Sequence, residues 1–334
     1  MRGARHLRLL TAAVAGSFDF RSSERRCHHL TPMNLMRRIG TSAAAMCVAG
    51  AIASGQAPAP TTLNTHGIEL TYVEQGHGAP VILLHGGQGD YRSWAPQLAA
   101  LSPHFRAISY SRRYNFPNRN QPAVTNHSAV IEATDLAALI TALHLGRVHL
   151  VGASLGAATA LAFALQHPEM VRSLVLAEPP IHSWIRDSTA TAAVFTQFMS
   201  TIQSPAERAF RAGDDTAGMR AFIDGFAGTS RFDHLAPAMR ATIMQNAAAM
   251  KALALSTDPY PAVPTGQVAQ LRMPILIVTG ASTIAIHRLV DDELIRLLPN
   301  AQSVTIPDAG HASPRENPTA FNAAMMAFLL GQKS

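Results

Sequence analysis

The sequence predicts an α/β protein: a mostly parallel sheet flanked by helices, with an inserted helical segment. Short apolar runs typical of buried strands alternate along the chain with segments whose apolar residues recur at helical spacing. Within this alternation, residues 179–273 show no strand pattern and are helical in character. A chain of 334 residues that is 48% hydrophobic and 14% charged is not disordered, and it is long enough for one large domain with an insertion.

The expected strands are of two kinds. Residues 67–74 alternate apolar and polar side chains, as in a half-buried strand. The other strands are continuous apolar runs, as in a sheet covered on both faces, and they are expected at 81–84, 106–110, 148–151, 171–176, 274–279 and 303–306. Helices are expected between them, at 128–145, 155–166, 289–298 and 318–330. Strands and helices in alternation favour parallel pairing.

Four parts of the chain follow from this pattern. We expect an N-terminal extension at 1–57, a first part of the core at 58–178, a helical cap at 179–273 and a second part of the core at 274–334. Phe and Met side chains are spread through the cap segment. Most should pack in the interior, and a minority should line a substrate pocket beneath the cap.

The basic charge of the chain is confined to its first 57 residues. These hold eight arginines and two acidic residues, and their net charge of +6 equals the formal net charge of the whole chain. The remainder is therefore neutral, which argues against nucleic acid as a partner. Both cysteines, Cys27 and Cys47, also lie in this segment, so the sequence excludes a disulfide scaffold and a four-thiolate zinc site.

The same segment has the three parts of a secretory signal peptide. A short basic start at 33–38 is followed by an uncharged stretch at 39–53, and Ala51-Ile52-Ala53 and Gly55-Gln56-Ala57 are candidate cleavage sites. We expect a periplasmic or secreted protein without a stable membrane span after processing. Met33 or Met36 is then the expected true start. An uncleaved membrane anchor is the alternative, although the apolar run is shorter than the roughly 20 residues of a spanning helix.

One motif carries the predicted chemistry. Gly152-Ala153-Ser154-Leu155-Gly156 stands between the strand at 148–151 and the helix at 155–166. A G-x-S-x-G run at a strand-to-helix turn exposes its serine at the amino end of a helix, where backbone N–H groups favour negative charge. An ordinary serine in a glycine-rich turn is the alternative. We predict that Ser154 is a nucleophile.

The loop His85-Gly86-Gly87-Gln88-Gly89 follows the strand at 81–84. Glycines at this position let backbone N–H groups approach a substrate carbonyl. We expect the N–H groups of Gly87 and Leu155 to stabilise an oxyanion, and Gln88 could add a side-chain donor. His85 is expected to brace the loop and not to act in catalysis.

A histidine is expected to reach Ser154 from the end of the last strand. Gly310-His311 follows the strand at 303–306, and small residues before His311 leave its imidazole free to act as the general base. The chain has 15 histidines, so any single one is usually structural. His287, just past the strand at 274–279, is the rival.

These motifs, together with the Arg112-Arg113-Tyr114 loop, resemble those of α/β-hydrolase-fold proteins with a helical cap. The resemblance covers nearly all of the body. It implies Ser154 as nucleophile and His311 as general base.

The acidic partner of His311 departs from the usual pattern of that family. Most members carry an Asp in the loop corresponding to 280–287, which here has no carboxylate, and Thr283 occupies the expected place. Some members, including haloalkane dehalogenases, place the acid one strand earlier. In this chain that position is Glu178, at the carboxyl end of a strand, and we predict that it orients His311. Asp308 and a degenerate triad remain alternatives.

The sequence therefore predicts a serine hydrolase that cleaves a small or medium apolar ester through an acyl-enzyme. A small-molecule substrate is the expected partner, no metal or organic cofactor is called for, and the oligomeric state is left open. Amide or lactone hydrolysis, perhydrolysis and carbon–carbon hydrolysis use the same residues. A non-catalytic ligand-binding protein with this fold is the alternative of a different class.

Overall fold

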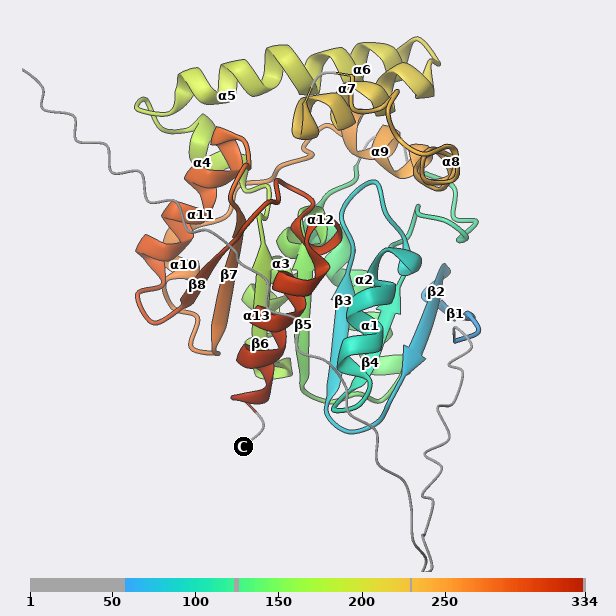
Figure 1. Cartoon of the computed structure of the whole chain (residues 1–334), viewed down its shortest axis with the longest axis vertical. Helices are drawn as coiled ribbons and strands as arrows, with labels where there is room; N and C mark the ends of the chain where they lie inside the picture. Colours follow the sequence, from blue (N-terminus) through green and yellow to red (C-terminus); the bar gives the residue numbers. More distant parts are fainter. Residues whose placement is uncertain (1–57, 123–125, 229, 333–334) are drawn as a thin grey trace, which may run out of the picture. The chain divides into compact units, whose positions relative to one another are not determined.

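The computed structural model describes residues 58–122, 126–228 and 230–332 (Figure 1). The predicted signal peptide and the rest of the segment 1–57 lie outside these described residues.

An eight-stranded sheet forms the centre of the described part of the chain, in the order β1-β2-β4-β3-β5-β6-β7-β8. β1 pairs antiparallel with β2, and β2 antiparallel with β4, while every other pair is parallel. The predicted α/β class with a mostly parallel sheet is confirmed. The strands are β1 (Thr61–Thr65), β2 (Ile68–Gln75), β3 (Pro80–Leu84), β4 (Arg106–Tyr110), β5 (Val148–Ala153), β6 (Val171–Ala177), β7 (Ile275–Gly280) and β8 (Gln302–Ile306).

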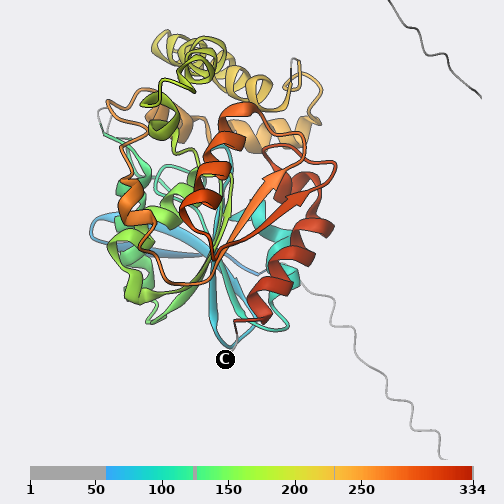
Figure 2. The ribbon, with the colours of Figure 1, turned by 90° about the vertical axis from the view of Figure 1, so that its left-hand side faces the viewer.

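Helices cover both faces of the sheet, and each face has its own apolar core (Figure 2). Along β3, Val81 and Leu83 pack with α1 (Ala95–Leu101) and α13 (Pro318–Leu330). The intervening Ile82 and Leu84 belong to the core on the other face, with α2 (Ala129–Ala142), α3 (Leu155–Gln166) and α11 (Ala285–Leu297). This alternation explains why the central strands are apolar throughout.

The segment between β6 and β7 contains helices and no strand in its described residues. Figures 1 and 2 show its first helices above the carboxyl ends of the strands, as a cap. A π-helical turn (Met199–Gln203) joins α5 to α6. The cap helices are α4 (His182–Arg186), α5 (Ala192–Phe198), α6 (Ser204–Arg211), α7 (Asp215–Ala227), α8 (Pro237–Met244) and α9 (Ala247–Ala254), and the chain then passes through α10 (Thr265–Val268) into β7.

Several short elements were not predicted. β1 is a polar edge strand, TTLNT, whose pattern carries no apolar alternation, and its pairing with β2 determines it. α1, α12 (Ser313–Glu316) and the 3-10 turns η1 (Tyr91–Trp94) and η2 (Pro168–Met170) are too short for a clear helical period. α11 begins at Ala285, earlier than predicted, and α2 ends at Ala142, before a residue with φ of 51°, His144.

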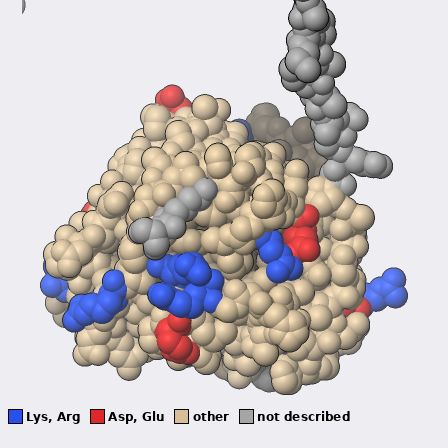
Figure 3. Space-filling model, turned by 90° about the horizontal axis from the view of Figure 1, so that it is seen from below, with Lys and Arg blue, Asp and Glu red and all other residues tan. Residues whose placement is uncertain are grey.

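The charged side chains are scattered on the face shown in Figure 3, where Lys and Arg form small separate groups among uncharged atoms. Among the described residues, no helix has the length and apolar character needed to cross a bilayer.

Candidate active site

Three side chains from distant parts of the chain meet at the carboxyl ends of the strands. Ser154 follows β5, Glu178 follows β6, and His311 lies in the loop after β8. Parallel strands bring their carboxyl ends to one edge of the sheet, which is where such folds gather functional groups. Ser154 and Glu178 have φ angles of 51° and 50°, unusual values for residues other than glycine. Backbone held in this region is often found at functional sites.

The turn that carries Ser154 depends on two close backbone approaches. A Cβ atom at Gly156 would lie 2.1 Å from the carbonyl oxygen of Leu84, and one at Gly152 would lie 2.5 Å from that of Gly156. Only glycine therefore allows α3 to start so near β3 and β5. The Ser154 N–H donates to the carbonyl of Ala177 at 2.8 Å, which holds the turn in line with the sheet.

Hydrogen bonds link the three side chains into one relay. The Nε2 atom of His311 lies 2.9 Å from Oγ of Ser154, and its Nδ1 atom lies 2.7 Å from Oε2 of Glu178. A carboxylate only accepts hydrogen bonds, so Nδ1 carries the proton and donates to Glu178. The lone pair of Nε2 then faces the Ser154 hydroxyl, in the arrangement required of a general base.

Glu178 is fully buried and is held by two further donors. Its Oε1 accepts from the Gly280 N–H at 2.7 Å, and its Oε2 accepts from the Thr283 hydroxyl at 2.6 Å. Thr283 occupies the place where the resemblance implies an acid, and here it donates to the acid that follows the neighbouring strand β6. Three donors on one carboxylate restrict its orientation.

The rival residues occupy other environments. Asp308 is exposed, with φ of 52°, while the Nδ1 atom of His311 is bound to Glu178. His287 is buried in the first turn of α11 and stacks on His311, with ring centroids 4.0 Å apart and an interplanar angle of 7°. Burial, the charge of His311 and that of His182 lower the pKa of His287 well below its ordinary value, so it stays neutral beside His311.

Gly87 and Leu155, the predicted oxyanion donors, lie with Ser154 on the wall of one cavity. Leu155 is the first residue of α3, where backbone N–H groups have no partner within the helix. A Cβ atom at Gly87 would lie 2.5 Å from Sδ of Met250 in α9, so the cap packs directly on this loop. Their role as oxyanion donors stays a prediction, and their place beside Ser154 on one cavity wall is compatible with it.

His85 and Arg112 support the start of the loop 85–89, which is called the oxyanion loop after its predicted role. Nδ1 of His85 donates to the Gly86 carbonyl at 2.8 Å, and its Nε2 accepts from the Arg112 N–H at 3.1 Å. Burial and the charge of Arg112 lower the pKa of His85 to about 3, in agreement with this neutral tautomer. The fully buried Arg112 guanidinium donates to the carbonyls of His85 and Gly86 and pairs with Glu132 at 3.1 Å.

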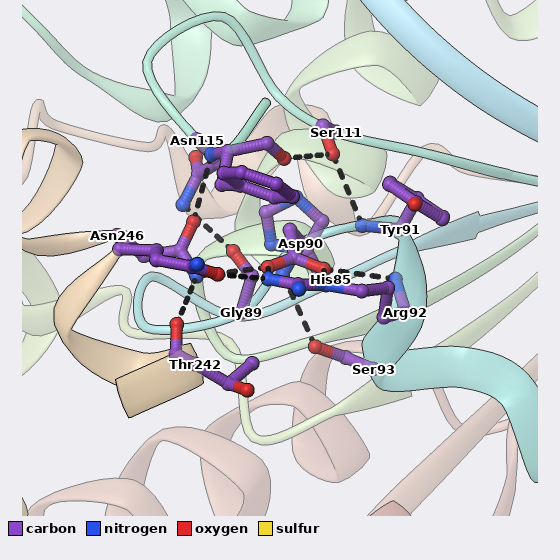
Figure 4. Close-up of polar contacts among 12 residues, drawn as sticks. His85, Gly89, Asp90, Tyr91, Arg92, Ser93, Ser111, Asn115, Thr242 and Asn246 are labelled. Atoms are coloured by element: carbon purple, nitrogen blue, oxygen red, sulfur yellow. Dashed lines mark hydrogen bonds and ion pairs between the residues drawn. The ribbon is translucent and has the colours of Figure 1, made fainter. Parts of the chain in front are cut away.

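A second network ties this loop to the cap (Figure 4). The Asn115 amide donates to the carbonyls of Gly87 and Gly89, at 3.1 and 2.8 Å. Asp90, next along the chain and fully buried, accepts from Asn246 of the cap at 3.0 Å. Burial raises the pKa of Asp90, but hydrogen bonds from Arg92 and Asn246 outweigh it and leave the pKa below its ordinary value. A charged Asp90 therefore fastens cap and loop together.

The cavity has a volume of about 600 Å³ and lies between the relay and the cap. Ser154, His311 and the oxyanion loop form its floor, and most of the remaining wall is apolar. Cap side chains on this wall include Phe222, Phe226, Ile243, Met250 and Leu253. A cavity of this size suits a ligand of small to medium dimensions.

Glu178, His287 and His311 also form a group of metal-ligating types, with ligand atoms within 4.8 Å of one another. An imidazole lone pair lies in the plane of its ring. The stacked rings of His287 and His311 therefore direct their lone pairs along nearly parallel planes and not toward a common ion. The geometry suits the hydrogen-bonded relay better than a metal centre.

Reasoning from the sequence missed Asn115, Asp90 and Asn246. The first two do have a weak signal, because they directly follow the Arg112-Arg113-Tyr114 and His85–Gly89 motifs. Asn246 lies in the cap and shows no local signal. The stacking of His287 was also missed, because α11 was expected to begin after this residue.

Comparisons with known proteins agree with this architecture. A family model described as the alpha/beta hydrolase fold matches residues 79–318. A putative carbamate hydrolase of Caulobacter sp. (strain K31) is 28% identical over 279 residues, covering 77% of this chain and 94% of the relative. A putative non-heme bromoperoxidase of Mycobacterium tuberculosis (strain H37Rv) is 26% identical over 272 residues, which cover 80% of this chain and 100% of the relative. The structure of a thermophilic esterase from Thermogutta terrifontis superposes with a TM-score of 0.66 and 25% identity. The superposition covers 83% of this chain and 100% of the esterase.

Proposed function

The chain belongs to the alpha/beta hydrolase fold family and is an enzyme of the hydrolase class, and on this premise we propose that it cleaves a small or medium carboxylic ester through an acyl-enzyme. The observation that carries the proposal is the unbroken relay from Glu178 through His311 to Ser154, which opens into an apolar cavity.

In the first half of the reaction, Ser154 is the nucleophile. Its Oγ attacks the ester carbonyl while Nε2 of His311, 2.9 Å away, takes the hydroxyl proton. Glu178 stabilises the imidazolium and keeps Nδ1 protonated. The N–H groups of Gly87 and Leu155 stabilise the oxyanion, and each such donor is worth about 3 kcal/mol of activation free energy.

Collapse of the tetrahedral intermediate breaks the ester bond. His311 returns its proton to the leaving alkoxide, which departs as the alcohol, and the acyl group remains on Ser154. Water then attacks the acyl-enzyme, with His311 again as the base, and the acid and free Ser154 are released. Each step conserves its proton and needs only groups of the relay and water.

The nucleophile is tested without knowledge of the substrate. A fluorophosphonate should label the protein once, and peptide mapping should place the label on Ser154. A short 4-nitrophenyl ester should give a burst of nitrophenolate followed by turnover, and Ser154→Ala should abolish both. A folded protein with neither label nor turnover would favour the non-catalytic ligand-binding alternative.

Perhydrolysis and carbon–carbon hydrolysis draw on the same relay, and one relative bears the name of a bromoperoxidase. Peroxide-dependent bromination, or cleavage of a diketone, at a kcat/KM above that for every ester would replace ester hydrolysis as the main activity.

We also propose export of the protein, through a signal peptide within 33–57, which lies outside the described residues. The exported protein should begin near Ser54 or Pro58 in N-terminal sequencing. An intact Met1 in the cytoplasm would contradict this.

A further inference from the structure

The cavity that holds Ser154 has an unequal set of charges on its wall. Its charged lining residues, apart from the histidines, are three arginines, Arg92, Arg231 and Arg315, and one acid, Glu316. Arg92 is already neutralised, because its Nη2 atom lies 2.6 Å from Asp90. Two cations, Arg231 and Arg315, and one carboxylate, Glu316, therefore remain on a wall that is otherwise largely apolar.

Arg231 and Arg315 reach the cavity from separate segments. Arg231 lies between α7 and α8 of the cap, and Arg315 lies in α12, just after His311. Among the described residues, neither guanidinium takes part in an ion pair or a side-chain hydrogen bond. The acid nearest in sequence, Glu316, instead accepts from the Gly310 N–H at 2.7 Å.

The environment of Arg315 is that of a residue facing a hollow. Its side chain is exposed to solvent, yet burial lowers its pKa; Glu316 raises the pKa and Arg231 lowers it again. A side chain can be both accessible and surrounded by protein only where the surface is concave. Arg231 and Arg315 both line this cavity, and the charge of Arg231 acts on Arg315 across it.

Two guanidiniums without an ion-pair partner on the wall of one cavity have the chemistry to bind an anion. A guanidinium fork matches the two oxygens of a carboxylate, and the bound anion also removes the repulsion between the two cations. The apolar remainder of the wall suits a carbon chain between this anion and the carbonyl at Ser154.

We propose that Arg231 and Arg315 bind a carboxylate of the substrate, so that the enzyme prefers esters or lactones carrying a carboxylate at a distance from the scissile carbonyl. This carboxylate does not react; it orients the substrate. The inference rests on the proposed ester hydrolysis and names the substrate class of that same site.

A pair of matched substrates tests the preference. The half ester of adipic acid with 4-nitrophenol carries a free carboxylate, and its methyl-capped counterpart is neutral and of nearly equal length. We expect kcat/KM to be at least about tenfold higher for the acid, as for a charge-assisted contact. The ratio should fall as ionic strength rises from about 0.05 to 0.5 M.

Substitution identifies the residues responsible. Arg231→Gln and Arg315→Gln should each lower the ratio of the two kcat/KM values, and the double variant should bring it near one. Arg272→Gln, an exposed arginine outside the cavity wall, is the matched control and should leave the ratio unchanged. A ratio near one in the parent protein, or a ratio that survives the double substitution, would overturn the proposal.

Direct binding separates this inference from ester hydrolysis itself. Calorimetry should detect adipate binding to the parent protein and loss of binding in the double variant. Adipate binding without turnover of either ester would support the carboxylate site and contradict the proposed hydrolysis. Turnover of both esters without adipate binding would support the proposed hydrolysis and contradict the carboxylate site. Binding of inorganic phosphate more tightly than adipate would overturn the assignment of a carboxylate.

Discussion

Replacement of Glu178 by glutamine tests the catalytic relay most directly, because the structure dictates how a glutamine must sit there. One carboxylate oxygen faces the Gly280 N–H at 2.7 Å, and the other faces both the Thr283 hydroxyl and Nδ1 of His311. The backbone N–H of Gly280 can only donate. The glutamine oxygen is therefore expected to face Gly280, and its NH2 group to face the other two.

This orientation changes the tautomer of His311. The hydroxyl of Thr283 can rotate to accept from the new NH2 group, but Nδ1 of His311 can accept only if its proton moves to Nε2. The protonated Nε2 would then face Ser154 and could not act as a base. We expect kcat to fall about 10³- to 10⁴-fold, equivalent to about 4 to 5.5 kcal/mol of activation free energy.

The assay is turnover of a short 4-nitrophenyl ester, with circular dichroism to confirm folding. Nitrogen-15 NMR of the histidines should show the proton of His311 moving from Nδ1 to Nε2. Asp308→Asn, an exposed acid near His311 in sequence, is the control and should keep activity within about twofold, as is usual for surface sites. Glu178→Gln activity within tenfold of the parent, with an inactive Asp308→Asn, would refute the assignment of the acid.

Three further predictions concern the scaffold. Gly156→Ala should lower the free energy of unfolding, measured in urea, by about 3 kcal/mol or more, because its Cβ would lie 2.1 Å from a carbonyl oxygen. Gly266→Ala is the control and should leave this free energy unchanged, because a Cβ there would have no neighbouring atom within 4 Å. Equal urea midpoints for the two variants would contradict the prediction. Asn246→Ala should lower kcat and, in parallel, the affinity for a boronic acid that mimics the oxyanion, because Asn246 holds Asp90 beside the oxyanion loop. A change in KM alone would contradict this and would indicate a role only in substrate binding. Acid should destabilise the protein below pH 6.5. Burial lowers the pKa of His85 and His182 from 6.5 to about 3, so that between pH 6.5 and pH 3 the unfolded chain binds more protons than the folded protein. Each of these two histidines should lower the free energy of unfolding by about 2 kcal/mol at pH 5. Equal urea midpoints at pH 7.5 and pH 5 would refute this prediction.

The network behind the oxyanion loop gives the cap a place in the mechanism. Asn246 bonds both Asp90 and the N–H of Phe116, at 3.0 and 2.9 Å, and so joins the cap to two loops of the core. Met250 of the cap packs against Gly87 of the oxyanion loop. The position of the loop that carries Gly87, a predicted oxyanion donor, therefore depends on how the cap packs against the core.

The sequence by itself determined the α/β class, the central strands, the helical insertion and the turn at Ser154. These features are local: a buried strand must be apolar along its length, and a tight strand-to-helix turn needs glycines at fixed spacing from the serine. β1 escaped prediction for the same reason, since its polar residues form a strand only by pairing with β2.

Only the tertiary structure decided which groups meet. Glu178 and His311 are 133 residues apart, and their 2.7 Å contact depends on the order and register of β6, β7 and β8. Glu178 was predicted from its place at a strand end and from the resemblance to family members that carry the acid there. Its donor Thr283, and Asn246 as the link from the cap, were not predicted. Contacts of this kind arise from the packing of whole elements, and no periodicity or spacing along the chain encodes the direction in which their side chains converge.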